Sequence, residues 1–380
     1  MKISMVTPVY PPHLGGIEII TQSIVRELQE RGNEVTVYHP PNMDVEKNNL
    51  PVIKHIINFF RAVKFLKTIQ CHDVDIIHVQ QTEPSLWYPF ILKRLYPKIP
   101  LIVHCHTLMI IDSGEDYCRF HFTLKGIARY LLMVLPGGYL EKNSIQSADH
   151  VIAVTEEVAT ICMKFRHSGV SLILNGIPLE EFPVRKTVRA CEPYKIFCPG
   201  RLTPEKGWIY VIEALPKILS EIDAFAIFSG NDAEGYKSVL MKRAEELNVS
   251  GRIKFLEGID FQTLIKWQSE CDIVVIPWVA ESFGLSVFEN LAMGNIIVCT
   301  NVGGISQFVS DREAVLLVEP ANPVQLASAI IEGLTNSELR NHIYKNAPEK
   351  AKEYDIKKTI DKIQTIYLNF SDRHICQRRV

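Results

Sequence analysis

The sequence contains no uninterrupted apolar run long enough to cross a membrane, since a spanning helix needs about 20 consecutive apolar residues. Its N-terminal run, Met1–Val6, has only the length of a strand and turns at Thr7-Pro8. Such a run is also too short for the apolar region of a signal peptide. We therefore expect a cytoplasmic protein without a membrane span, which leaves adsorption to the cytoplasmic face of a membrane open.

An excess of charge of either sign is absent as well. The chain carries 41 lysines and arginines against 43 aspartates and glutamates, a formal net charge of −2. This balance gives no reason to expect nucleic-acid binding, which requires a basic surface. The nine cysteines are odd in number and include no C-x-x-C pair, so we expect neither a disulfide framework nor a zinc site.

Apolar residues are abundant, at 47% of 380 residues, and a chain of this length suffices for two domains. The regular pattern breaks in a polar stretch that has prolines at both ends. We expect an N-terminal domain over 1–180, a linker over 181–193 and a second domain over 194–354. Isoleucines at helical spacing predict that 355–380 begins with a helix returning toward the first domain and ends in a loosely ordered tail from residue 371.

Strand-like runs alternate with helical patterns in both halves, which predicts an α/β protein of two Rossmann-like domains with parallel sheets. Open parallel sheets bind ligands at the carboxyl ends of their strands, so we expect the ligand in a cleft between the two domains. In the first half the predicted strands are Lys2–Thr7, Glu34–His39, Asp75–Val79, Leu101–Cys105, His150–Val154 and Ser171–Leu174, with a helix at Ile17–Arg31. In the second half they are Lys195–Cys198, Ala224–Phe228, Arg252–Leu256, Asp272–Ile276 and Ile296–Cys299, with helices at Trp208–Ser220, Ala233–Leu247 and Leu285–Met293.

One candidate motif, Gly200–Gly207, follows the first strand of the second half and opens a helix. It brings Arg201 and Lys206 to the carboxyl edge of the sheet. Arginine offers a planar fork and lysine a compact charge, and both are common partners of phosphoryl oxygens. The motif favours a diphosphate ligand, although a solvated basic turn would explain it if it stood alone.

A second motif, Pro277–Leu285, contains Glu281 and leads into a helix that bears Glu289. The free N–H groups of Phe283, Gly284 and Leu285, together with the helix dipole, favour an anion at that end. Glu289, two turns along if the helix starts near Ser282, has a carboxylate that can accept hydrogen bonds from a ribose diol. A helix-capping acid and a surface glutamate are the alternative interpretation of the two carboxylates.

The ordered set of these motifs, followed by Gly303-Gly304, resembles the donor domain of glycosyltransferase family 4. The first half adds Gly15-Gly16 after the first strand, His106 after the fourth and Asn175-Gly176-Ile177 before the linker. The resemblance implies a GT-B fold and a retaining glycosyltransferase. The sequence departs from the family pattern at Gln307, where relatives often have glutamate, and at Asn290, where they often have alanine.

The resemblance implies a role for each of these residues. Arg201 and Lys206 neutralise the leaving diphosphate of a nucleotide-sugar donor. Glu281 binds hydroxyls of the donor sugar, and Glu289 accepts hydrogen bonds from the ribose. His106 hydrogen-bonds the donor sugar near its anomeric carbon. Gly15 and Gly16 let backbone N–H groups approach donor phosphate. The family retains the anomeric configuration without an obvious protein nucleophile, so the diphosphate itself accepts the proton of the acceptor.

No metal or other cofactor is expected. Asp73-Val74-Asp75 has the Asp-x-Asp pattern that binds metal in the other large glycosyltransferase fold. Here it precedes an apolar run, so we interpret Asp75 as a residue at the start of a strand. We likewise interpret His104 as a core histidine with satisfied hydrogen bonds.

Three other functions stay open. A non-hydrolysing nucleotide-sugar epimerase would use the same diphosphate and ribose contacts, and a non-catalytic nucleotide-binding subunit would keep them without turnover. An NAD-dependent dehydrogenase is disfavoured, because Gly15–Glu18 lacks the G-x-G-x-x-G spacing.

The acceptor is expected to be a glycan, a glycolipid or a lipid-linked molecule bound by the first half. Two segments, 54–67 and 119–135, are basic and rich in aromatic residues, a composition found in helices that lie in an anionic headgroup layer. Core-facing helices with a basic outer face are the alternative.

Overall fold

The computed structural model describes residues 1–10, 16–40, 60–82, 85–106, 108, 135–185, 191–232, 235–281 and 283–378. Gly15, residues 54–59 of the segment 54–67 and all but the last residue of 119–135 lie outside this part of the chain. The described chain forms two compact units, one of Met1–Gly176 with Ile356–Val380 and one of Ile177–Asp355. Among the described residues, no helix is long and apolar enough to span a membrane.

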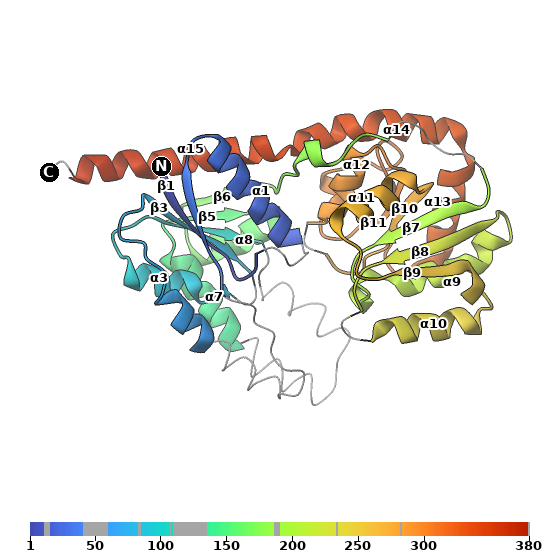
Figure 1. The fold of residues 1–380 in the computed structure, drawn as a ribbon, viewed down its shortest axis with the longest axis horizontal. Helices are drawn as coiled ribbons and strands as arrows, with labels where there is room; N and C mark the ends of the chain where they lie inside the picture. Colours follow the sequence, from blue (N-terminus) through green and yellow to red (C-terminus); the bar gives the residue numbers. More distant parts are fainter. Residues whose placement is uncertain are drawn as a thin grey trace. The chain divides into compact units, whose positions relative to one another are not determined.

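The first unit is built on a parallel sheet with the strand order β2-β1-β3-β4-β5-β6 (Figure 1). The order changes direction between β1 and β3, which makes this pair the switch point of the sheet. The strands are β1 (Lys2–Val6), β2 (Glu34–Tyr38), β3 (Ile76–Gln81), β4 (Leu101–Cys105), β5 (His150–Ala153) and β6 (Val170–Leu172). The helices are α1 (Gly16–Glu30), α3 (Tyr88–Leu95), α7 (Leu135–Ser147), α8 (Glu156–Phe165) and α15 (Ile356–Arg378), and residues 60–66 are also helical.

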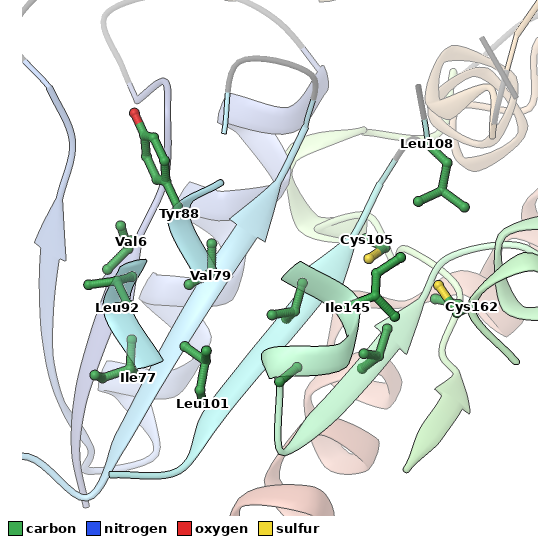
Figure 2. Packing of buried hydrophobic residues seen from close by; sticks show 14 of the residues in the cluster. Val6, Ile77, Val79, Tyr88, Leu92, Leu101, Cys105, Leu108, Ile145 and Cys162 are labelled. Carbon is green, nitrogen blue, oxygen red and sulfur yellow. The ribbon is translucent and has the colours of Figure 1, made fainter. Parts of the chain in front are cut away.

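Alternation along the strands divides the buried residues of this sheet between its two faces. Figure 2 shows one face, where strand residues such as Val79 and Leu101 pack against α3, α7 and α8 through Leu92, Ile145 and Cys162. The opposite face carries the histidines His78 of β3 and His104 of β4, which alternate with the apolar residues of the first face. There His78 of β3 bonds the Tyr367 hydroxyl of α15, which packs beside α1.

The second unit contains a parallel sheet in the order β12-β11-β10-β7-β8-β9 (Figure 1). Read from β9, this is the 3-2-1-4-5-6 order of the dinucleotide-binding fold, with its switch point between β7 and β10. The strands are β7 (Tyr194–Pro199), β8 (Ala224–Ser229), β9 (Ile253–Leu256), β10 (Ile273–Ile276), β11 (Ile297–Thr300) and β12 (Leu316–Val318). The helices are α9 (Trp208–Leu219), α10 (Tyr236–Glu246), α11 (Phe261–Glu270), α12 (Leu285–Ala292), α13 (Pro323–Thr335) and α14 (Ser337–Ala351), with short 3-10 turns at Leu179–Glu181, Pro204–Lys206, Ser250–Arg252, Ile305–Gln307 and Lys352–Tyr354.

The α/β class and the two parallel sheets are confirmed, and most predicted elements agree with the structure to within one or two residues. The helix α15 continues into the expected tail as far as Arg378, and the loose order of that tail stays a prediction. The first unit ends at Gly176, earlier than the boundary expected at residue 180. His104 is buried as expected, but both of its ring nitrogens lack a hydrogen-bond partner within the described chain.

Candidate functional site

The loop after β7 is drawn tightly against the neighbouring strand β8. Gly230 follows β8, and a methyl group at its α-carbon would lie 2.1 Å from the Gly200 carbonyl oxygen. The Leu202 N–H also donates to the Asn231 carbonyl at 3.0 Å. These contacts fix the backbone that carries Arg201 at the carboxyl edge of the sheet.

The loop after β10 meets the loop after β7 at the switch point. The Val279 N–H donates to the Glu205 carbonyl oxygen at 2.8 Å. Gly207 has a φ of +70°, and a methyl group there would lie 1.9 Å from the Pro277 carbonyl oxygen. The two motifs predicted from the sequence therefore form one continuous site, and only glycine allows this approach.

One ion pair joins the two motifs. Lys206 Nζ lies 2.6 Å from Glu281 Oε2, and the two side chains are 14% and 20% exposed. The Arg201 guanidinium is exposed, while its backbone carbonyl accepts a 2.8 Å hydrogen bond from Trp208 Nε1. The site thus offers one exposed guanidinium and one ammonium that an acidic partner neutralises.

The helix α12 begins at this edge of the sheet. Gly284 is its N-cap residue, with φ +81°, and no side chain of the described residues caps the first turn. Its leading N–H groups and dipole therefore favour an anion, as the sequence predicts. Because the helix starts at Leu285 rather than near Ser282, Glu289 lies about one turn along it, not two.

Glu289 is 8% exposed, and burial raises the pKa of its carboxyl to about 7, with a smaller contribution from the Glu181 carboxylate. A buried carboxylate of this kind lacks water as a hydrogen-bond donor. Hydroxyl groups of a ligand would supply the missing donors. The geometry therefore suits the ribose diol that the sequence assigns to Glu289.

We expect Glu289→Gln to stabilise the ligand-free protein at pH 8 but not at pH 4.5. In the unfolded chain this carboxyl ionises with its ordinary pKa of 4.5, while in the folded chain it stays protonated until about pH 7. The free energy of unfolding therefore falls as the pH rises through this window, by up to about 3 kcal/mol. Urea titrations of the wild type and the variant at the two pH values measure the gain in the free energy of unfolding. An equal gain at both pH values would contradict the raised pKa of the Glu289 carboxyl.

His106 follows β4 in the first unit and is only 3% exposed. Its Nε2 lies 2.5 Å from Gln80 Oε1, and its Nδ1 lies 3.4 Å from Asn175 Nδ2. Burial lowers the pKa of the imidazole to about 4, so the ring is neutral at pH 7. Since an amide oxygen only accepts, the ring proton sits on Nε2, and Nδ1 is left as an acceptor.

The structure gives three residues roles in these sites that the sequence did not predict for them. Gln80 orients His106, Gly230 holds the Arg201 loop, and Trp278 lies under the Lys206 ammonium. Gly230 and Trp278 lie within two residues of the ends of β8 and β10, so their place at the sheet edge was open to prediction. Gly16 is the first residue of α1 and is exposed.

Comparison with known proteins gives two family matches that together cover most of the chain. Residues 181–350 match the family described as glycosyl transferases group 1, and residues 14–181 match glycosyltransferase family 4. The chain is 30% identical to a D-inositol 3-phosphate glycosyltransferase of Corynebacterium glutamicum, over 73% of this chain and 68% of that protein. It is 27% identical to an uncharacterized glycosyltransferase of Methanocaldococcus jannaschii, over 93% and 94% of the two chains.

A solved structure shares the fold. The crystal structure of Anabaena HepE in complex with UDP and glucose superposes with a TM-score of 0.72 and 19% identity, covering 97% of this chain and 99% of that one.

Proposed function

Because the chain belongs to the family of glycosyl transferases group 1 and has its GT-B fold, we propose that it is a retaining, metal-independent glycosyltransferase that uses a nucleotide-diphosphate sugar. It moves a hexosyl or N-acetylhexosaminyl group to a glycan, a glycolipid or a lipid-linked acceptor. The observation that carries the proposal is the meeting of Arg201, Lys206 and Glu281 at the switch point of the second sheet.

The proposed chemistry depends on stabilising the leaving nucleotide. As the bond between the anomeric carbon and the diphosphate oxygen breaks, negative charge grows on the diphosphate. Arg201, Lys206 and the N–H groups of Phe283, Gly284 and Leu285 at the start of α12 stabilise that charge. A diphosphate oxygen takes the proton of the attacking acceptor hydroxyl, so the new glycosidic bond forms on the face that the nucleotide leaves.

The ends of the donor are held by the two glutamates. Glu289 accepts hydrogen bonds from the ribose diol. Glu281 accepts from hydroxyls of the transferred sugar once Lys206 has turned to the diphosphate. The UDP and glucose named for the HepE structure make UDP-glucose the first donor to test, and the C. glutamicum relative makes D-inositol 3-phosphate the first acceptor.

Product analysis by NMR separates transfer from epimerisation. The protein is incubated with UDP-glucose, UDP-N-acetylglucosamine or GDP-mannose, each with and without D-inositol 3-phosphate or a lipid-linked acceptor mixture. We expect nucleoside diphosphate and a new α-linked product only when acceptor is present. A change of the sugar in the donor alone would instead establish the epimerase.

His106→Ala is expected to lower the transfer rate by about 10- to 100-fold, the effect of one lost hydrogen bond to a developing charge. The rise in melting temperature caused by UDP should stay unchanged, because the diphosphate and ribose contacts proposed above belong to the second unit. His150→Ala, at the opposite edge of the same sheet, is the control. Unchanged transfer by His106→Ala would remove this residue from the mechanism.

Attachment to an anionic membrane surface also stays a prediction of the sequence. Co-sedimentation with anionic but not neutral liposomes would support it, and equal recovery with both would end it.

A further inference from the structure

The Lys206 ammonium has two partners in the second unit, one charged and one aromatic. Its Nζ lies 2.6 Å from Glu281 Oε2 and 4.2 Å from the centroid of the Trp278 ring. The carboxylate is a partner that a diphosphate can replace. The indole face is one that stays.

Trp278 is itself held firmly. It lies two residues after β10 and is 4% exposed. Its carbonyl oxygen accepts a 2.5 Å hydrogen bond from Thr300 Oγ1 at the end of β11. Its six-membered ring lies so close to Gly284 that a methyl group there would be 3.0 Å away. The same ring therefore contacts Lys206 and the residue that starts α12.

The indole N–H of Trp278 does not explain why a tryptophan stands here. Nε1 is buried and has no hydrogen-bond partner in the part of the chain that the structure describes. Leaving such a donor unpaired costs about 1–3 kcal/mol, a cost that phenylalanine or leucine would avoid. A gain that offsets this cost is available from its face, which attracts a cation more strongly than any other side-chain ring.

Binding of a diphosphate requires the Lys206 ammonium to change partners. In the empty site Glu281 neutralises it, so an incoming diphosphate must displace the carboxylate. A long lysine side chain released from this ion pair would regain rotamer freedom, which costs binding free energy when it is ordered again. A contact that persists through the exchange removes most of that cost.

We propose that Trp278 is a positioning residue of the diphosphate site. Its indole face holds the Lys206 ammonium in place while the Glu281 carboxylate is exchanged for a diphosphate oxygen. This role rests on the proposed function, because it requires that a nucleoside diphosphate binds at Lys206.

A double-mutant cycle tests the role directly. The full chain is titrated with UDP, and in parallel with GDP and ADP, by calorimetry. The proteins are the wild type, Trp278→Phe, Trp278→Leu, Lys206→Met and the two double variants. We expect Trp278→Leu to weaken binding by about 5- to 30-fold and Trp278→Phe, which keeps a ring face, by about two- to threefold. In the Lys206→Met background both effects should vanish.

Trp267→Leu is the matched control, because Lys254 Nζ lies 5.3 Å from the Trp267 ring in the same unit but outside the two motifs. Losses that persist in the Lys206→Met background would show that Trp278 acts by packing and would overturn the proposal. If Trp278→Leu fails to fold, the comparison of Trp278→Phe with the double variant Trp278→Phe/Lys206→Met decides the question. A wild type that binds none of the three nucleotides would overturn the proposed function, and this role with it. If the wild type binds a nucleotide but the Trp278 substitutions weaken binding equally with and without Lys206, the role alone is overturned.

Discussion

Lys206→Met is expected to lower kcat for sugar transfer by about 10²- to 10³-fold, the loss that follows when one preorganised charge-stabilising group is removed. The methionine side chain fills similar space but carries no charge, so the departing diphosphate loses its ammonium partner. The Glu281 carboxylate also loses the cation that lies 2.6 Å away, so the diphosphate keeps only Arg201 and the N–H groups at the start of α12. Steady-state kinetics with saturating donor and acceptor measure the effect.

Lys254→Met provides the control for this substitution. Lys254 also lies over a tryptophan ring of the second unit, and its removal should leave kcat within about twofold of the wild type, as expected for an exposed side chain away from the site. If Lys206→Met kept the wild-type kcat, charge stabilisation by this residue would be ruled out.

Gly207→Ala is expected to destabilise the second unit by at least about 4 kcal/mol, which is in the range of the most disruptive single substitutions. The added methyl group would lie 1.9 Å from the Pro277 carbonyl oxygen, and backbone cannot turn aside as a side chain can. A φ of +70° adds about 1–2 kcal/mol of strain for any residue with a β-carbon. Urea unfolding of the purified variant measures the loss, together with the loss of nucleotide binding.

Gly258→Ala separates the two causes. Gly258 has a φ of +64°, but a methyl group there would meet nothing within 4 Å. The free energy of unfolding of this variant should fall only by the cost of the strained φ, about 1–2 kcal/mol. Equal losses in the two variants would mean that the contact between the loops after β7 and β10 is not what requires glycine at position 207.

The sequence was sufficient to predict that both motifs lie at the carboxyl edge of one sheet, because each follows a predicted strand. It did not show that β7 and β10 are neighbours, since two other strands separate them along the chain. The adjacency depends on the order in which strands pair, and alternation of strands and helices does not encode that order. The pairing of Lys206 with Glu281 therefore emerged only from the structure.

The position of Glu289 along α12 and the hydrogen-bond partners of His106 could not be predicted from the sequence either. The start of α12 at Leu285 agrees with the predicted helix Leu285–Met293, but the placement of Glu289 two turns along assumed a start near Ser282, which the positive φ of Gly284 prevents. Gln80 and Asn175 reach His106 from other parts of the chain, and the spacing between them carries no signal. Contacts of this kind depend on tertiary packing, which residue patterns do not specify.

Thermal unfolding in the presence of UDP, GDP, ADP and CMP, and of their common sugar conjugates, tests the donor site most directly, since a ligand that binds only the folded chain raises its melting temperature. We predict that one nucleoside diphosphate and its conjugates raise the melting temperature of the wild type, and that Arg201→Ala and Glu289→Ala each abolish the rise. No rise with any nucleotide, or a rise that persists in both variants, would contradict a nucleotide-sugar site where the loops after β7 and β10 meet.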